Sequence, residues 1–442
     1  MRRNHHVHVR PPRRPRLAYL VSQYPAVSHT FILREVLALR ALGHDIQTAS
    51  VNPADRPVDR LDVDERREAE GTYCLKAHGA FGAGLALLWA LLHHPGGLLR
   101  ILRRAPALGP LHRGLGRSSL IGLAYAVEAA MLARWMAQHG RTHLHVHFGS
   151  AAATVGLLVR QLCGCHLSLT VHGPDEFDDV GAQQLRAKVA EADAIVCISQ
   201  FARSQLMRLS PPEHWAKIVV CRLGVDPNAF DPPAAPASPP ERTDGHALQL
   251  LCVGRLTPAK GQVLLLHALS RLRREGHPVR LTLVGGGPDQ ARLREQVAVL
   301  GLADVVTLTG ALNPQQARTH YHRADAFVLP SLAEGIPVVL MEAMASGLPC
   351  VSTTVNGIPE LIEHLHNGLL IAPGDVDALT DALRRVVTSS ALRDRLGRAA
   401  RETVALGFHH GRNTERLSRI FEGFAPARLL RQPRRAASAV EA

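Results

Sequence analysis

A unit made of a short apolar run, a turn of glycine or polar residues, and a helical segment recurs along this 442-residue chain. In the first half, such runs are HLHVHFGS, LSLTVHGPDEF, AIVCISQFARSQL and IVVCRLGVD, and in the second half LQLLCVGRL opens the series. Repeated units of this kind are typical of parallel sheets with helices on both faces. The sequence therefore predicts an α/β protein, and its length is typical of two or three domains.

A linker divides the chain into two domains. Residues 231–245, DPPAAPASPPERTDG, are too rich in proline and polar residues to form a core element. We therefore expect a boundary near residue 240. The N-terminal domain covers residues 17–240, with a helical insertion at 76–139, and the C-terminal domain covers residues 246–410. Each domain is predicted to be a Rossmann-like, doubly wound sheet.

Most of the net charge of +13 lies near the two ends of the chain. Residues 1–16 contribute +6 and residues 426–442 contribute +3, which leaves +4 for the rest. Nucleic acid binding requires a basic stripe on a folded surface, and only 4% of the residues are aromatic, too few for base stacking. We expect no nucleic acid partner. The leader, 1–16, is predicted to be disordered, and the tail, 426–442, to be solvated or attracted to anionic lipid.

The cysteines and the apolar runs bear on the compartment. Seven cysteines are scattered through strand-like runs, which is typical of buried, reduced thiols in a cytosolic protein. No signal-peptide pattern is visible, and the longest apolar run, 81–92, is too short to span a bilayer. The basic, apolar insertion can lie in a membrane interface or pack on its own domain. We expect a cytoplasmic protein with the inner membrane surface as a candidate partner.

Two carboxylates eight positions apart mark a candidate site in LAEGIPVVLMEAMASGLP. Glu334 and Glu342 flank a turn that ends in Pro337, which suits the first position of a helix. The first amides of such a helix attract phosphate. Glu342 would lie roughly 7–8 Å further along the helix, close to the span from a phosphate to the hydroxyls of its ribose. A surface helix with two solvated glutamates has the same spacing and remains the alternative.

Two cations precede another helix at the start of the C-terminal domain. Arg255 and Lys260 follow the strand LLCVG in the pattern G-R-x-x-x-x-K-G. Cations and helix amides at one strand end form a diphosphate clamp, although two surface cations would look the same. The P-loop pattern is absent, and no D-x-D motif stands at a strand end. We therefore expect neither a metal nor a cofactor.

Several of these motifs resemble one known family over residues 17–424. E-G-I-P-x-x-x-x-E-A-M-A-x-G-x-P resembles the signature of retaining, nucleotide-sugar-dependent glycosyltransferases of family 4, which have the GT-B fold of two Rossmann-like domains facing a cleft. TVHGPDEF resembles the family's T-x-H-G-x-D, and NGIPE at 356–360 resembles a turn near the sugar site. SHTFILRE resembles the S-E-T-F-x-x-x-E of exopolysaccharide and colanic-acid members, with His29 in place of the first acid.

The resemblance implies a retaining, hexosyl-type glycosyltransferase in polysaccharide biosynthesis. It would transfer sugar from a nucleotide-diphosphate sugar to a glycan or lipid-linked acceptor, and a helix at 411–425 would return to the N-terminal domain. The implied residues are His172 and Glu334 as catalytic, Arg255, Lys260, Gly310, Leu312, Gly335, Ile336, Pro337, Val338 and Glu342 as donor-binding, and Ser28, Thr30 and Asp175 on the acceptor side.

Three other classes share parts of this pattern. A Rossmann-type oxidoreductase needs the G-x-G-x-x-G fingerprint, which is missing. A glycoside hydrolase places two carboxylates across a bond, whereas Glu334 and Glu342 lie along one loop and helix. A non-catalytic nucleotide- or sugar-binding protein would tolerate the loss of Arg255 or Lys260, and both are present.

Overall fold

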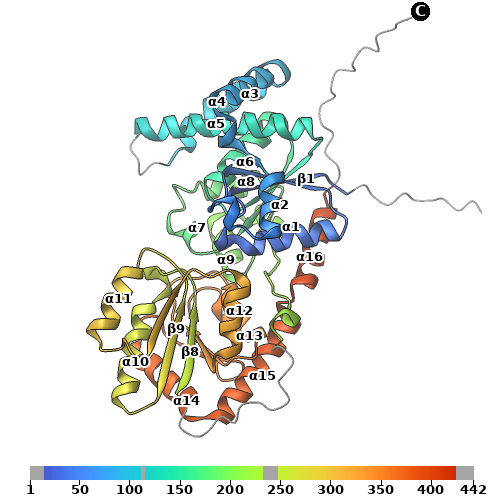
Figure 1. Ribbon diagram of the computed structural model, residues 1–442. Helices are drawn as coiled ribbons and strands as arrows, with labels where there is room; N and C mark the ends of the chain where they lie inside the picture. The colour runs from blue at the N-terminus through green and yellow to red at the C-terminus, as the bar shows by residue number, and fades with distance from the viewer. Residues whose placement is uncertain (1–13, 111–114, 232–246, 425–442) are drawn as a thin grey trace, which may run out of the picture. The chain divides into compact units, whose positions relative to one another are not determined.

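The computed structural model describes residues 14–110, 115–231 and 247–424 (Figure 1). Most of the predicted leader and linker, and all of the predicted tail, lie outside these residues. Contacts divide the chain into two compact units. The first comprises Met1–Thr170, Val180–Ile195 and Glu415–Ala442, and the second comprises Val171–Asp179 and Val196–Thr414.

The first sheet has seven strands in the order β3-β2-β1-β4-β5-β6-β7. They are β1 (Leu17–Gln23), β2 (Ile46–Asn52), β3 (Tyr73–Cys74), β4 (His143–His147), β5 (His166–Val171), β6 (Ala194–Cys197) and β7 (Ile218–Val220). β1 pairs in parallel with β2 and with β4, with Leu20 opposite Ala49 and Val146. All three residues are fully buried, as expected for a parallel sheet covered on both faces.

The helices between these strands include the predicted insertion. They are α1 (Thr30–Ala41), α2 (Val63–Gly71), α3 (Gly79–His93), α4 (Pro95–Arg104), α5 (Leu115–Gln138), α6 (Ala151–Cys163), α7 (Asp175–Asp178), α8 (Leu185–Glu191) and α9 (Gln200–Leu209). The insertion forms α3, α4 and α5, and Figure 1 shows α3 on the side of α5 away from the strands.

The second sheet has six strands, all parallel, in the order β10-β9-β8-β11-β12-β13. They are β8 (Leu248–Val253), β9 (Val279–Val284), β10 (Val306–Gly310), β11 (Ala326–Leu329), β12 (Cys350–Thr353) and β13 (Leu369–Ile371). Relative to the chain, this is the doubly wound order 3-2-1-4-5-6. The strand order reverses between β8 and β11, and ligands of such sheets bind beyond the carboxyl ends of the strands at that point.

The helices of the second half cover both faces of this sheet, with α10 and α11 on one face and α12 and α13 on the other (Figure 1). They are α10 (Gln262–Arg274), α11 (Gln290–Val299), α12 (Pro314–Arg323), α13 (Val338–Ala345), α14 (Val376–Thr388) and α15 (Ser390–Gly407), followed by α16 (His410–Glu422). The sequence predicts that Asp375 or Asp377 caps α14, and Asp375 does so by accepting a hydrogen bond from the Ala378 amide at 2.8 Å. The prediction of two parallel α/β sheets is confirmed.

Two local predictions were wrong. Pro337 has extended backbone angles and is the N-cap of α13, so the helix begins one residue later than expected. The sequence SQYPAVSHTF predicts a helix cap near Ser28 or Thr30, but the N-cap of α1 is His29, without a side-chain bond, and Thr30 is the first helical residue. The preceding 3₁₀ turn, Val27–His29, already directs the chain into the helix, so a side-chain cap is not required.

Candidate functional site

The loops that follow β8 and β11 meet at the reversal point of the second sheet. The Leu332 amide donates to the Ala259 carbonyl at 2.7 Å, which joins the two loops through the backbone. Gly261 has a positive φ of 65°, and a Cβ there would lie 2.1 Å from the Pro330 oxygen. Only glycine permits this approach without displacing the β11 loop. The sequence therefore fixes the spacing of two loops that are 70 residues apart in the chain.

Lys260 and Glu334 form an ion pair between these loops. The Lys260 Nζ lies 2.5 Å from Glu334 Oε1, and the Ser331 hydroxyl donates to the same oxygen at 2.8 Å. Glu334 is buried, so its charge requires such partners. The sequence predicts that Lys260 binds a diphosphate and that Glu334 binds a sugar, and the structure brings the two side chains together. Their pairing with each other and the hydrogen bond from Ser331 were not predicted.

The loop after β8 also carries Arg255, whose side chain is exposed. Its carbonyl accepts a hydrogen bond from the buried Gln262 side chain at 3.0 Å, which attaches the loop to the start of α10. The backbone of Arg255 is thus held while its guanidinium remains accessible to solvent. An accessible guanidinium on a fixed backbone is suited to grip two oxygens of an anion.

Helix α13 starts beside Glu334. Its N-cap, Pro337, has no side-chain oxygen to accept hydrogen bonds from the first amides, among them that of Val338. Ile336, by contrast, is buried in the core of the unit and holds the loop in place. An uncapped helix start with a cation nearby attracts a phosphate group.

Glu342 lies one turn further along α13. Its Oε2 accepts a hydrogen bond from the Tyr321 hydroxyl at 3.1 Å. Burial raises the pKa of Tyr321 well above its usual range, and the nearby Glu342 carboxylate raises it further. Tyr321 therefore remains a neutral donor that orients Glu342. This positioning residue was not identified from the sequence, where a tyrosine on α12 carries no distinguishing motif.

The ends of β9 and β10 add backbone to the same edge of the sheet. The Gly285 amide donates to the Gly310 carbonyl at 2.9 Å, and a Cβ on Gly285 would lie 1.9 Å from the Gly254 oxygen. Gly310 has a positive φ of 77°. Leu312, two residues later, packs against the core. The predicted donor residues Gly310 and Leu312 thus lie where the backbone of three strand ends converges.

His172 follows β5 and is buried. Its amide donates to Glu176 Oε2 at 2.6 Å, and the Gly173 amide donates to the same oxygen at 2.9 Å. The residues 171–179 group with the second unit, in which a Cβ on Gly335 would lie 2.0 Å from the His172 oxygen. Two of the predicted residues, His172 and Gly335, are therefore in backbone contact. Glu176 fixes this turn, whereas the predicted acceptor-side residue Asp175 is exposed.

Glu360, in the turn that resembles the family's sugar-site turn, already has partners. Its carboxylate accepts hydrogen bonds from the Gln200 and Phe201 amides at 2.9 and 2.8 Å, and Arg222 lies 3.2 Å away. All belong to the second unit. The carboxylate thus caps the start of α9. It occupies a position that an external anion would otherwise take.

In the first unit, Ser28 lies in the turn that follows β1 and Thr30 begins α1, at the point where the strand order reverses between β1 and β4. Behind it, Glu35 Oε1 accepts a hydrogen bond from the Tyr19 hydroxyl at 2.9 Å and lies 3.2 Å from His147 Nε2. The predicted acceptor-side residues therefore lie at a strand-end position equivalent to that of Lys260.

A buried polar network underlies that loop. Glu35, His145 and His147 place three potential ligand atoms within 4.8 Å of one another. The ring nitrogens of His145 lie 2.7 and 3.0 Å from the hydroxyls of Ser168 and Thr170. These hydrogen bonds and those of Glu35 account for the cluster as a satisfied part of the core. The sequence HLHVHFGS offers His145 and His147 as weaker candidates for acceptor contacts, but both side chains are fully buried.

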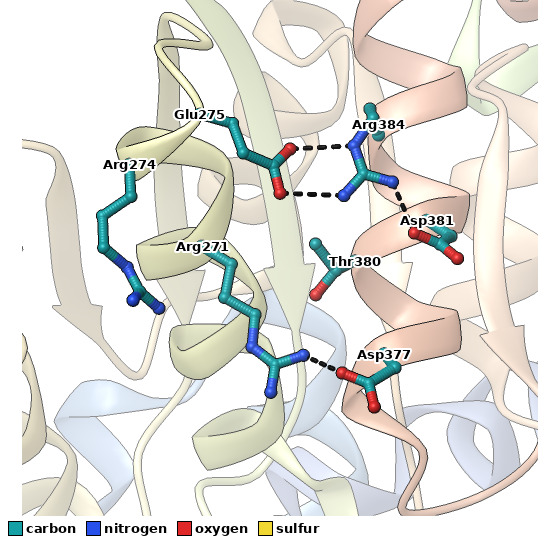
Figure 2. A pocket seen from close by; sticks show the side chains of 7 residues that line it. All are labelled: Arg271, Arg274, Glu275, Asp377, Thr380, Asp381 and Arg384. Carbon is teal, nitrogen blue, oxygen red and sulfur yellow. Dashed lines mark hydrogen bonds and ion pairs between the residues drawn. The ribbon is translucent and has the colours of Figure 1, made fainter.

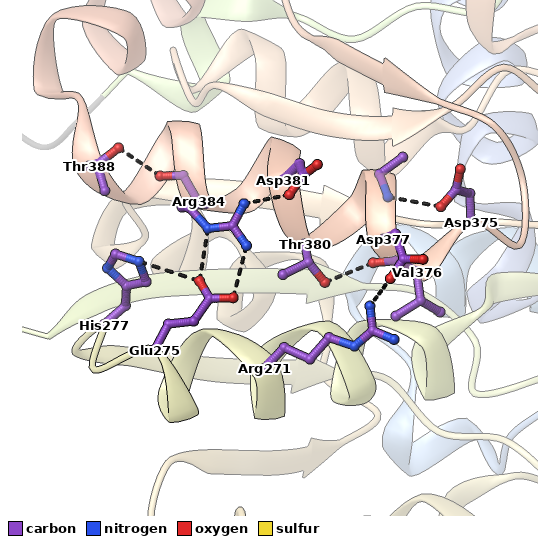
Figure 3. A network of polar contacts seen from close by, with 11 residues as sticks. Arg271, Glu275, His277, Asp375, Val376, Asp377, Thr380, Asp381, Arg384 and Thr388 are labelled. Carbon is purple, nitrogen blue, oxygen red and sulfur yellow. Dashed lines mark hydrogen bonds and ion pairs between the residues drawn. The ribbon is translucent and has the colours of Figure 1, made fainter.

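A hollow of about 300 Å³ lies elsewhere on the second unit, between α10 and α14 (Figure 2). Five of its charged side chains pair with one another: Arg384 with Glu275 and Asp381, and Arg271 with Asp377 (Figure 3). Arg271 is nine residues, roughly 14 Å, along α10 from the strand ends. This network is a solvated seam between two helices and does not form part of the site at the strand ends.

The second unit thus combines a doubly wound sheet with a cation, an uncapped helix start and carboxylates at its reversal point, an arrangement typical of nucleotide-binding α/β proteins. Comparison with known proteins is more specific. Residues 28–229 match the model of "Glycosyltransferase Family 4", and residues 237–403 match that of "Glycosyl transferases group 1". The chain therefore belongs to the glycosyltransferase family that these two models describe.

Relatives and solved structures agree with that assignment. A glycosyltransferase of amylovoran biosynthesis from Erwinia amylovora is 31% identical over 93% of this chain and 100% of its own length. A GDP-mannose-dependent alpha-(1-6)-phosphatidylinositol monomannoside mannosyltransferase of Mycobacterium tuberculosis is 31% identical over 64% of this chain and 77% of its own length. The HepE protein of Anabaena, solved with UDP-glucose, has a TM-score of 0.69 at 17% identity, covering 92% of this chain and 100% of its own. The predicted GT-B fold and glycosyltransferase class are confirmed.

Proposed function

We propose that this glycosyltransferase transfers a hexose from a nucleoside-diphosphate sugar, with retention of anomeric configuration, to a growing glycan in polysaccharide biosynthesis. The observation that carries the proposal is the pairing of Lys260 with Glu334 at the reversal point of the second sheet, beside the start of α13. The amylovoran relative supports the polysaccharide, and the UDP-glucose and GDP-mannose named for other similar proteins support the donor class.

Charge develops on the leaving diphosphate as its bond to the sugar breaks. Arg255, Lys260 and the first amides of α13 stabilise that charge, because they are held in place before the reaction. These positive groups take the part that a divalent cation plays in other transferases, so the reaction requires no metal ion.

The Lys260–Glu334 pair sets up an exchange of partners. When the diphosphate enters, Lys260 turns to its oxygens, and the Glu334 carboxylate accepts hydrogen bonds from the donor sugar instead. Lys260 and Glu334 each keep polar partners before and after donor binding, so neither charged group is left without hydrogen bonds. Glu342 accepts hydrogen bonds from the ribose, and His172 contacts the sugar.

The acceptor is a carbohydrate chain or a lipid-linked sugar. The mannosyltransferase relative is named for a phosphatidylinositol monomannoside, which is a glycosylated lipid. Ser28, Thr30 and Asp175 form the acceptor side, because Ser28 and Thr30 follow β1 at the reversal point of the first sheet and Asp175 is exposed and close to His172 in the chain.

Two measurements test the proposal. The product formed from an α-linked donor should give an α-anomeric proton signal by NMR, and a β signal would contradict retention. Lys260→Met should lower kcat/KM by about 100-fold or more, as expected for the loss of one stabilising donor. The matched control is Arg271→Met, which removes an ion-paired cation from α10 far from the strand ends and should change kcat/KM less than about threefold. Equal effects of the two substitutions would contradict the clamp.

A further inference from the structure

Helix α3 exposes its large apolar side chains and buries its small ones. The residues it buries are Ala86 and Ala90, one turn apart on the side that packs on α5. Phe81, Leu88 and Leu92 on other sides are 80%, 53% and 69% exposed. A helix that packs only on its own unit directs its large apolar residues inward. This helix has the opposite pattern, so its outer surface is built to contact something apolar.

The charge distribution around α3 restricts what that contact is. Residues 79–92 contain no Asp, Glu, Lys or Arg, and residues 76–138 contain seven Lys or Arg but only one acid, Glu128. Burial raises the pKa of Glu128, so its charge is weakened further. Helix α4, which packs on α3, exposes Arg100 and Arg103 alongside Leu99 and Leu102. The surface is therefore apolar along one helix and cationic along the next.

The length of α3 argues against a membrane span. By length and composition, two described helical stretches, Leu75–His93 and Gly116–Gln138, could cross a membrane. The first is broken at Gly79, which has a positive φ of 56°, and the remaining helix is 15 residues, roughly 22 Å, shorter than a bilayer core. The second is half buried within its own unit. A short helix with exposed leucines beside a cationic helix is suited to lie in the plane of the interface.

We propose that the outer surface of α3 and α4 binds the interface of an anionic phospholipid bilayer. The apolar row on α3 enters the boundary between headgroups and acyl chains, and Arg100 and Arg103 contact the lipid phosphates. An anionic bilayer fits this surface better than a protein partner does, because the apolar side chains project outward along a convex helix and the flanking charge is of one sign. The binding depends on neither the donor nor the acceptor.

Flotation of the full-length protein with vesicles tests this inference. The protein should bind vesicles of equal parts phosphatidylglycerol and phosphatidylcholine, and should bind pure phosphatidylcholine about tenfold more weakly, since each cation near an anionic surface contributes about 1 kcal/mol. Added salt should weaken binding. Leu88→Gln with Leu92→Gln should weaken binding about tenfold or more, because two leucines that would enter the bilayer are lost. These side chains are exposed, so the variant should remain folded and keep its activity on a soluble acceptor.

The control removes equally exposed apolar side chains elsewhere. Leu406 on α15 and Val299 on α11 are 67% and 72% exposed, and Leu406→Gln with Val299→Gln should leave vesicle binding unchanged. In a variant with Trp135 and Trp215 replaced by Phe, Trp89 of α3 remains as the reporter, and its emission should shift to the blue on anionic vesicles. Failure to bind vesicles, equal loss in both double variants, or a change in oligomeric state caused by L88Q/L92Q without lipid would each overturn the proposal.

Discussion

At the scale of single residues, Glu342 depends on a partner from another helix. The buried Tyr321 hydroxyl donates to it at 3.1 Å. If Glu342 accepts the ribose hydroxyls, Glu342→Ala should raise the Kd for a nucleoside diphosphate about 10- to 100-fold, because a hydrogen bond to a charged group contributes about 1.5–3 kcal/mol. Isothermal titration measures this. Tyr321→Phe, which loosens the carboxylate without removing it, should have a smaller effect, and Ala at the exposed Glu402 should have none. Unchanged affinity in Glu342→Ala would show that the ribose lies elsewhere.

The sequence predicted charged residues at strand ends better than it predicted their partners. Lys260 and Glu334 were both identified, because spacing to a strand end and a helix start is a local property. Their pairing was not, since it depends on the order β8-β11, which no local pattern encodes. Ser331, Tyr321 and Glu176 were missed for a related reason. Each acts through side-chain hydrogen bonds whose geometry exists only in the folded unit.

At the scale of elements, the close approach of two loops depends on Gly261. Its φ of 65° already disfavours other residues, and a Cβ would lie 2.1 Å from the Pro330 oxygen. Gly276 provides the matched control, with a φ of 85° and no atom near the added Cβ. Gly276→Ala should cost about 1 kcal/mol of folding free energy, the backbone term alone. Gly261→Ala should cost more and should also weaken nucleotide binding.

Denaturant unfolding measures the loss of folding stability in each variant, and nucleotide titration measures the loss of nucleotide affinity. Equal losses of stability in Gly261→Ala and Gly276→Ala, with unchanged nucleotide affinity, would show that the β11 loop moves freely and does not set the site.

Element boundaries were otherwise predicted well, because strands and helices follow the apolar periodicity. The exceptions, Pro337 and the start of α1, lie at helix ends, where one residue of shift changes a backbone angle but not the pattern.

At the scale of the whole molecule, the architecture was the most predictable feature. Parallel sheets arise from a repeated unit, so each apolar run supports the interpretation of the others as strands. In both sheets the strand order reverses beside the strand that comes first in the chain. The exposed surface of α3 was less predictable, because periodicity does not show which side of an apolar helix is covered. Only the packing of Ala86 and Ala90 on α5 settles that the leucines face outward.

Ligand binding to the folded chain provides the last prediction. A ligand at 100-fold excess over its Kd stabilises the folded state by about 2.7 kcal/mol. UDP or GDP should therefore raise the unfolding midpoint in differential scanning fluorimetry, and the donor base is the one that gives the larger shift. If Arg255 and Lys260 supply the positive charge, as we propose, the shift should be the same in EDTA and in Mg²⁺.

Inorganic sulfate controls for nonspecific anion binding by a chain of net charge +13. Lys260→Met should abolish most of the nucleotide shift and leave the sulfate effect unchanged, since the substitution removes a single charge from a built site. A nucleotide shift that appears only when Mg²⁺ is added would mean that the two cations cannot neutralise the diphosphate alone, and the metal-independent mechanism would then be wrong.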